Sequence, residues 1–334
     1  MRFGPVATAE AEGAVLAHSV ALPDGRLRKG VVLGGDDVAA LCAAGIAQVI
    51  VAQLDPDDMG EDVAADLLAD ALLAQAVGLR RSAAFTGRVN LIADEPGVVD
   101  LDVAAIEAIN AIDPMLTIAT VPPFQQMASG GMVATIKMIS YAVPRAAVEA
   151  ACALATDALN LRAPVLPDAT LIITEIPGGA GDKGKRAIED RLSALGVGLV
   201  ETVMVPHDQT TLAQAIAGAR GALILILTGS ATSDIADVAP AALLQAGGQV
   251  SRFGMPVDPG NLLFLGDLQG RAVIGLPGCA RSPALNGADW VLSRVVCGVP
   301  VTAADIAGMG VGGLLKEIPT RPQPRGVPPK SYPT

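Results

Sequence analysis

The sequence predicts an α/β protein whose C-terminal half is built on a parallel-rich sheet. Between residues 169 and 227, short apolar runs alternate with helical stretches: strands are expected over 169–174, 200–205 and 222–227, and helices over 185–195 and 210–219. Strands and helices that alternate in this way are joined by right-handed crossovers, which give a parallel sheet covered on both faces. Ligands bind beyond the carboxyl ends of such strands, so we expect the chemistry in the loops after residues 174 and 227.

Composition excludes several classes of protein. The chain has 334 residues, of which 51% are hydrophobic and 2% aromatic, and its formal net charge is −11. The apolar content excludes disorder over most of the chain. The net negative charge and the low aromatic content argue against nucleic-acid partners, and the negative charge also argues against binding to anionic membranes. No apolar run approaches the roughly 18 residues that cross a bilayer. With four scattered cysteines and no signal peptide, we expect reduced thiols and a cytoplasmic protein.

Changes of composition along the chain predict four parts. Residues 1–79 are expected to form a small β/α unit that ends in an Ala-rich helix over 57–77, and residues 80–165 an α+β middle segment. The α/β domain is expected over 166–310. Residues 311–334 are rich in proline and are predicted to be a linker or tail.

The loop after residue 227 has the composition of an anion-binding loop. Its small and hydroxyl residues precede a helix that is expected to begin near Asp237, and the candidate ligands are Thr228, Gly229, Ser230, Thr232, Ser233 and Asp234. Successive backbone N–H groups and a helix N-terminus can hold an anion. The alternative is a solvated turn in which Asp237 only caps the helix.

This loop resembles the molybdopterin-binding domain of molybdopterin adenylyltransferases, molybdopterin molybdotransferases and the competence-damage-inducible family. Their pattern T-G-G-T-G-x-x-x-x-D-V-T-P meets Thr228 to Thr232 and then Asp237 to Pro240. The resemblance implies a three-layer, Mog-like domain and a catalytic part for Asp237. The chain departs from the pattern at Ser230, Ala231 and Thr232, where a Cβ narrows the approach of a ligand to the backbone.

Three further stretches resemble the same family. Residues 255–266 resemble K-P-G-K-P-x-x-x-G, with Met255 and Asp258 in place of the lysines. Residues 275–283 resemble G-L-P-G-N-P-x-S, followed by a helix expected from Ser282; this implies that Gly275, Pro277, Gly278 and Ser282 bind the ligand. Cys279 replaces the family's Asn, and we expect it as a reduced thiol near the pocket mouth. The loop over 177–186 resembles the first ligand loop and contributes Gly178, Gly179, Lys183 and Lys185, with Arg186 beside them.

The N-terminal half adds weaker similarities. Residues 29–51 resemble a run of the molybdotransferases, and residues 86–91 and 132–137 look like segments of bifunctional molybdenum cofactor cytidylyltransferases. In those proteins a molybdopterin-binding half precedes a nucleotidyltransferase half, whose signature this chain lacks.

The resemblance implies that the chain binds molybdopterin or its nucleotide form, as ligand or substrate, during molybdenum cofactor biosynthesis. It would position the pterin for a nucleotidyltransferase domain, and a homo-oligomer is expected. Two alternatives remain open. In the first, the chain is a self-sufficient enzyme, either a molybdotransferase or a competence-damage-type pyrophosphatase, that uses Asp237 with Mg²⁺. In the second, the chain is a structural, oligomerising half.

Overall fold

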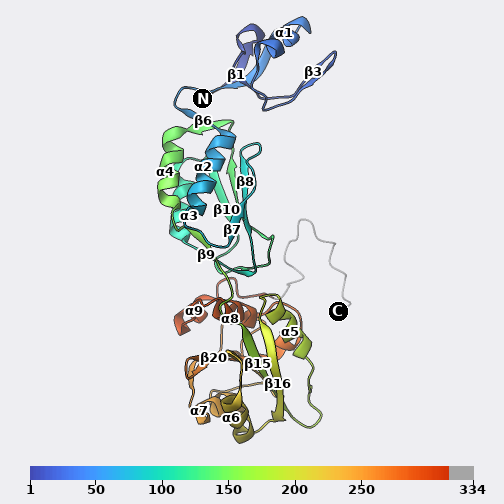
Figure 1. The fold of residues 1–334 in the computed structure, drawn as a ribbon, viewed down its shortest axis with the longest axis vertical. Coiled ribbons are helices and arrows are strands. Elements are labelled where there is room, and N and C mark those ends of the chain that lie inside the picture. The colour runs from blue at the N-terminus through green and yellow to red at the C-terminus, as the bar shows by residue number, and fades with distance from the viewer. Residues whose placement is uncertain (316–334) are drawn as a thin grey trace, which may run out of the picture. The chain divides into compact units, whose positions relative to one another are not determined.

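The computed structural model describes residues 1–315, which fall into two units (Figure 1). The first unit is Met1–Ala163, and the second begins at Pro164. Residues 316–334, which include most of the predicted Pro-rich tail, lie outside the described residues. In the described part of the chain, no helix has the length and apolar character that spanning a bilayer requires. The predicted limits of the four parts stay predictions.

The first 53 residues form a small antiparallel sheet with the order β1-β5-β2 and a separate hairpin, β3-β4. Leu16 and Val51 lie in the core beneath this sheet, together with Leu41 of helix α1. Helix α1 begins after Gly34, whose N–H donates to the Asp37 carboxylate at 3.0 Å. The elements are β1 (Arg2–Ala7), η1 (Thr8–Glu10), β2 (Val15–Leu16), β3 (Val20–Leu22), β4 (Gly25–Leu27), α1 (Gly35–Ala43) and β5 (Gln48–Gln53).

The rest of unit 1 packs three helices against antiparallel sheets, with strand orders β10-β12-β8-β7, β11-β9-β14 and β13-β6. The helices are α2 (Glu61–Leu73), α3 (Val103–Ile112) and α4 (Arg145–Ala155). The strands are β6 (Asp58–Gly60), β7 (Leu79–Arg81), β8 (Arg88–Ala93), β9 (Gly97–Leu101), β10 (Leu116–Thr120), β11 (Gln126–Met127), β12 (Met132–Met138), β13 (Ala142–Pro144) and β14 (Leu159–Arg162).

The helix predicted over 57–77 is shorter than expected. It begins at Glu61, because residues 58–60 pair with 142–144 as strands β6 and β13. Its buried face, including Leu68 and Leu72, shares one core with Leu91 and Ile136 of the following strands. Strand pairing that reaches more than 80 residues along the chain decides where this helix starts, and the local pattern carries no sign of it.

Unit 2 is built on a six-stranded sheet with the order β16-β15-β17-β20-β19-β18. Its strands are β15 (Asp168–Glu175), β16 (Gly198–Pro206), β17 (Leu223–Leu227), β18 (Gln249–Phe253), β19 (Phe264–Leu268) and β20 (Arg271–Leu276). The pairs β15-β16, β15-β17 and β17-β20 are parallel, whereas β19 is antiparallel to both β18 and β20. The α/β class is confirmed, and the sheet is mixed.

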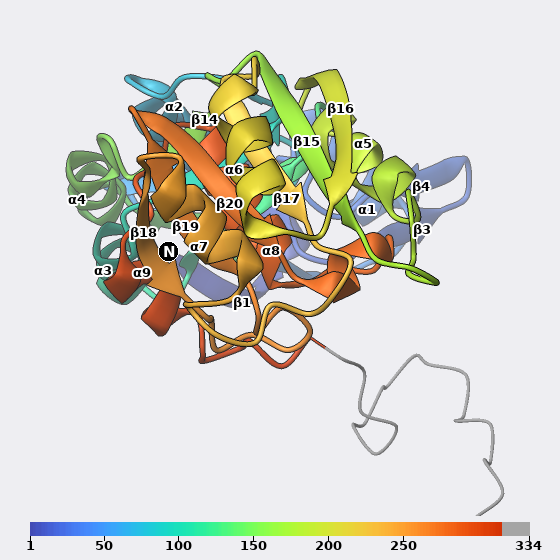
Figure 2. The same cartoon turned by 90° about the horizontal axis from the view of Figure 1, so that it is seen from below.

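The helices of unit 2 cover both faces of this sheet. They are α5 (Lys185–Ser193), α6 (Gln209–Gly218), α7 (Val238–Gln245), α8 (Gly287–Val296) and α9 (Ala303–Gly308), with the short 3₁₀ helix η2 (Gly278–Arg281). Helices α6 and α7 share a core with Ile172, Ile224 and Phe264 on one face (Figure 2). The chain moves from β15 to β16 on one side and then back past β15 to β17, so right-handed crossovers place α5 on the face opposite α6.

The alternating pattern predicted these elements well. The three strands and two helices expected between residues 169 and 227 all form, each with bounds within two residues of the expected ones. Ile172, Ile224 and Ile226 are fully buried, as the apolar runs indicate.

We expect Gly275→Ala to destabilise unit 2. Gly275 is buried in β20, where an added Cβ would overlap the ring of Phe264, itself fully buried. Overpacking of this kind costs about 1–3 kcal/mol. Urea unfolding followed by the fluorescence of Trp290, the chain's one tryptophan, measures the loss. Gly218→Ala is the matched control, because its Cβ would meet open space at the end of α6. Equal stability of the two variants would contradict the packing role of Gly275.

Candidate functional site

The parallel strands of unit 2 bring the predicted ligand loops to one edge of the sheet. Ile173 of β15 lies opposite Leu227 of β17, and Leu227 lies opposite Leu276 of β20. The three loops that follow, residues 176–184, 228–237 and 277–286, therefore leave the sheet at the same end. We call them loops A, B and C. This is the edge at which α/β proteins bind their ligands.

The guanidinium of Arg281 joins all three loops. Arg281 belongs to loop C. Its Nη1 donates to the carbonyl oxygens of Gly181, at 3.3 Å, and Lys183 in loop A, and its Nη2 donates to the Thr228 carbonyl of loop B at 3.0 Å. Gly184, the last residue of loop A, has φ +97°, and a Cβ there would lie 2.7 Å from the Cα of Arg281. Burial lowers the pKa of the guanidinium from its ordinary value, yet it stays charged at neutral pH. Within residues 1–315 it makes no ion pair with a carboxylate.

Thr174, at the end of β15, connects loop B to His207, the residue that follows β16. Its hydroxyl accepts a hydrogen bond from the Gly229 N–H at 2.8 Å and shares another, also 2.8 Å, with Nδ1 of His207. Thr174 is fully buried. A Cβ at Gly229 would lie 2.8 Å from the Thr174 carbonyl oxygen, so this position needs glycine for its close approach. His207, which directly follows β16, thus lies at this sheet edge beside loop B.

Asp237 caps helix α7 and closes loop B. Its Oδ1 accepts from the Val238 N–H at 2.7 Å, and its Oδ2 accepts from the Ser233 N–H at 2.9 Å. The hydrogen bond from Ser233, and then the one from Val238 and the charge of His207, lower the pKa of this carboxyl from its ordinary value, against the opposing effect of burial. The capping role is thus accounted for by geometry, and the catalytic role stays a prediction.

The other candidates of loop B divide into buried and exposed groups. Thr228 and Thr232 are buried, with their hydroxyl oxygens 3.4 Å apart. Ser230, Ser233 and Asp234 are exposed, and the Asp234 carboxylate accepts from the Ala236 N–H at 2.8 Å. The exposed hydroxyl residues of loop B are therefore the two serines, and the Ser233 hydroxyl donates to the Ala231 carbonyl at 3.4 Å.

The predicted cation cluster is partly neutralised. Lys185 pairs with Glu189 at 3.7 Å along α5, and Arg186 pairs with Asp190 at 2.9 Å. Lys183 is exposed in loop A and, within the described part of the chain, forms no ion pair. Gly178 and Gly179 lie earlier in the same loop, before α5 begins. Lys183 and Arg281 are therefore the two cations of these loops without a carboxylate partner among the described residues.

Loop C differs from expectation at its helix. The helix predicted from Ser282 begins instead at Gly287, because Asn286 and Asp289 form a capping box. Gly278 is the first residue of the short helix η2. Pro277 is the N-cap of this helix, and Ser282 is its C-cap. Gly275 lies inside β20 rather than in the loop. The predicted start of the helix at Ser282 is thus wrong. The binding roles of Gly275, Pro277, Gly278 and Ser282 stay predictions.

Arg191 of α5 braces loop C, and sequence analysis did not single it out. Its guanidinium donates to the carbonyls of Ala280, Ser282 and Ala284 at 2.9–3.0 Å and pairs with Asp289. The two side chains of that pair are only 11% and 13% exposed. These partners lie about 90 residues apart in sequence, so no local spacing could reveal them.

Cys279 lies in loop C, in the short helix η2. Cys279 carries a free, partly exposed thiol, and burial raises its pKa. Among residues 1–315, no three His, Cys, Asp or Glu side chains come together as metal ligands. Mg²⁺ commonly binds through one or two carboxylates together with substrate phosphates. Asp237 could serve such a metal only with oxygens from the ligand.

Comparisons with known proteins give one partial family match and a set of similar solved structures, two of which are described here. A family model described as a domain of unknown function (DUF8806) matches residues 5–53. No curated protein matches the chain. The crystal structure of the molybdopterin biosynthesis MoeA protein from Pyrococcus horikosii is 14% identical with a TM-score of 0.33, over 89% of this chain and 75% of that one. A molybdenum cofactor biosynthesis protein from Pyrococcus furiosus is 12% identical with a TM-score of 0.25, over 92% of this chain and 65% of that one.

We expect Arg281→Gln to loosen the three loops. The change removes the donors to three carbonyl oxygens, which is expected to cost about 2–3 kcal/mol in the free energy of unfolding. Amide hydrogen exchange in loops A and B should become faster than in the wild type. Arg186→Gln, which removes an exposed ion pair on α5, should change stability by less than about 0.5 kcal/mol. Unchanged exchange in both loops would contradict the joining role of Arg281.

The stabilisation by Asp237 should depend on pH. Because the folded protein lowers the pKa of this carboxyl, its contribution is complete above the unfolded-state pKa of about 3.9 and is lost as the pH falls through the folded value. Asp237→Asn keeps a capping side chain but loses the charge, so it should be less stable than the wild type by about 0.3–1 kcal/mol at pH 7, and the gap should narrow toward pH 3. Urea unfolding at both pH values measures it. A gap that does not change with pH would show that the charge has no part in the cap.

Proposed function

We propose that the chain binds molybdopterin at the sheet edge formed by loops A, B and C. The parts of the ligand that are recognised would be its anionic phosphate and its pterin ring. The observation that carries the proposal is the junction at Arg281. Three loops that resemble ligand loops of one family meet there around a cation that has no carboxylate partner among the described residues. In a chain of net charge −11, an anion needs local donors of this kind.

The proposed work of the site is binding and positioning. Lys183 and the charge of Arg281 would hold the phosphate, and the backbone of Gly229 with the hydroxyls of Ser230 and Ser233 would line the approach to it. The Arg281 N–H groups at Nη1 and Nη2 already donate to carbonyl oxygens, so its part is to fix the loops and supply positive potential. The three-layer, Mog-like arrangement belongs to the same proposal.

This binding would serve molybdenum cofactor biosynthesis. The chain would present the bound pterin to a nucleotidyltransferase domain. That partner and a homo-oligomeric state stay proposals. The main alternative is a self-sufficient molybdotransferase or pyrophosphatase, in which Asp237 would act through Mg²⁺. The capping bonds of Asp237 favour the binding role, because both carboxylate oxygens already accept backbone N–H groups.

Calorimetric titration of the full chain with molybdopterin, with and without Mg²⁺, tests the proposal. We expect saturable binding that does not need Mg²⁺. Lys183→Gln should weaken it by about tenfold, as loss of a charge-assisted phosphate contact does. Arg186→Gln, a neighbouring cation already paired with Asp190, is the matched control and should bind like the wild type.

Two outcomes would contradict this proposal. Absence of binding heat at any tested concentration would remove the site. Binding that requires Mg²⁺ and is lost in Asp237→Asn would instead support the enzyme alternative, especially if the protein alone turned the ligand over.

A further inference from the structure

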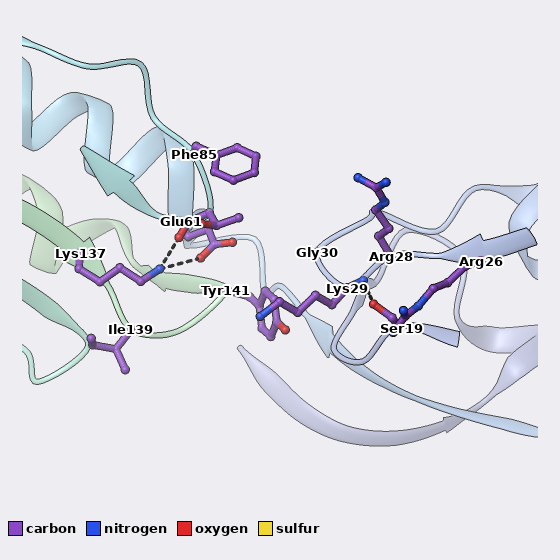
Figure 3. A pocket seen from close by; sticks show the side chains of 11 residues that line it. Ser19, Arg26, Arg28, Lys29, Gly30, Glu61, Phe85, Lys137, Ile139 and Tyr141 are labelled. Carbon is purple, nitrogen blue, oxygen red and sulfur yellow. Dashed lines mark hydrogen bonds and ion pairs between the residues drawn. The ribbon is translucent and has the colours of Figure 1, made fainter. Parts of the chain in front are cut away.

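Unit 1 contains a large cavity, of about 1090 Å³, far along the sequence from the loops of unit 2. One wall is the β3-β4 hairpin and the turn that follows it, and the other comes from α2, β12 and the turn before β8 (Figure 3). The second wall contains Thr86 and Lys137, which lie within the two segments, 86–91 and 132–137, that the binding site of unit 2 does not use.

The lining of this cavity is strongly positive although the chain is acidic. Arg26, Arg28, Lys29 and Lys137 face it, whereas Glu61 is the one acidic residue in the lining. The first three are exposed, and in the described part of the chain none of them forms an ion pair with a carboxylate. In Figure 3 the side chain of Lys29 extends from the hairpin wall toward Tyr141. Clustered, unpaired cations attract and hold phosphate groups.

The opposite wall is firmly built. The Lys137 ammonium lies 3.7 Å from the Glu61 carboxylate and donates to the Thr86 carbonyl. Gly87, with φ +69°, lies so close to Glu61 that a Cβ would come within 2.6 Å of its Oε2, and the Gly87 N–H donates to Asp62 at 2.6 Å. The Glu61 side chain is 19% exposed, and burial raises its pKa. Its carboxylate retains acceptor capacity beyond Lys137.

Apolar and aromatic surface completes the cavity. Phe85 is 75% exposed and Ile139 is 56% exposed, and both line it. Tyr141 is fixed, because its hydroxyl donates to the Ala17 carbonyl at 2.9 Å and its ring stacks on Phe3 with 6.4 Å between centroids. An exposed phenyl ring beside a cluster of cations offers a stacking face for a planar heterocycle.

We propose that this cavity binds a nucleotide that carries two or more phosphates. Arg26, Arg28 and Lys29 would hold the phosphates, Phe85 would stack on the base, and Glu61 would accept hydrogen bonds from N–H groups of the ring. The inference does not rest on the function proposed for unit 2, since it uses none of the same residues.

Titration of the full chain with ADP, inorganic pyrophosphate and adenosine tests the inference. ADP should bind, and pyrophosphate and adenosine should each bind at least about tenfold more weakly, because each lacks one half of the recognised chemistry. Binding of ADP should weaken as salt is added, since the phosphate contacts are exposed.

Exposed side chains allow variants that keep the fold. The double variant Arg28→Gln/Lys29→Gln should weaken ADP binding by at least about tenfold. Phe85→Ala should weaken ADP binding to the level of pyrophosphate and leave pyrophosphate binding unchanged. Arg145→Gln, an exposed arginine of unit 1 that does not line the cavity, is the matched control and should bind ADP like the wild type.

The inference is overturned if ADP does not bind, if either test variant binds it like the wild type, or if adenosine binds as tightly as ADP. It is also overturned if ADP binding is lost in Lys183→Gln but kept in the double variant, which would move the nucleotide to the edge of unit 2. Failure of molybdopterin binding alone leaves the inference standing, because the variants of unit 1 do not touch that edge.

Discussion

The guanidinium of Arg281 is the constraint on which the candidate site of unit 2 depends. Parallel pairing of β15, β17 and β20 brings three loops to one edge, but it does not fix how they lie against one another. Arg281 does so by donating to carbonyls of both other loops, and Arg191 holds loop C from the side of α5. Close approaches at Gly184 and Gly229 depend on the absence of a Cβ. Backbone geometry, rather than a set of catalytic side chains, therefore defines this edge, which is consistent with a site that binds and positions.

In the described part of this acidic chain, two surfaces each gather cations that have no carboxylate partner. Many cations of the described residues are neutralised locally, as Lys185 and Arg186 are by acids one turn further along α5. Those without such partners include Lys183 and Arg281 at the edge of unit 2 and the three cations of the β3-β4 hairpin region in unit 1. Surface charge that is left unpaired costs little in stability, whereas it raises the local potential for an anion. The two proposals thus follow from one electrostatic pattern applied to two separate surfaces.

The sequence predicted the local elements of this fold better than its contacts. Periodicity placed the strands and helices between residues 169 and 227, and the composition around Asp237 indicated a helix cap, because both depend on neighbours in sequence. The helix of loop C was misplaced because the Asn286–Asp289 capping box competes successfully with Ser282 as a start. Arg191 and Arg281 gained their roles from partners about 50 to 100 residues away. The cavity of unit 1 was not predicted, since the hairpin cations and Lys137 come together only in the folded chain.

Hydrogen exchange of the full chain with and without molybdopterin reports directly where the ligand binds. We expect slower amide exchange in residues 176–184, 228–237 and 277–286, the three loops joined by Arg281, with no comparable change in residues 19–30 or 85–88. Protection that is absent from these loops, or that appears only in unit 1, would contradict the assignment of the molybdopterin site to this edge.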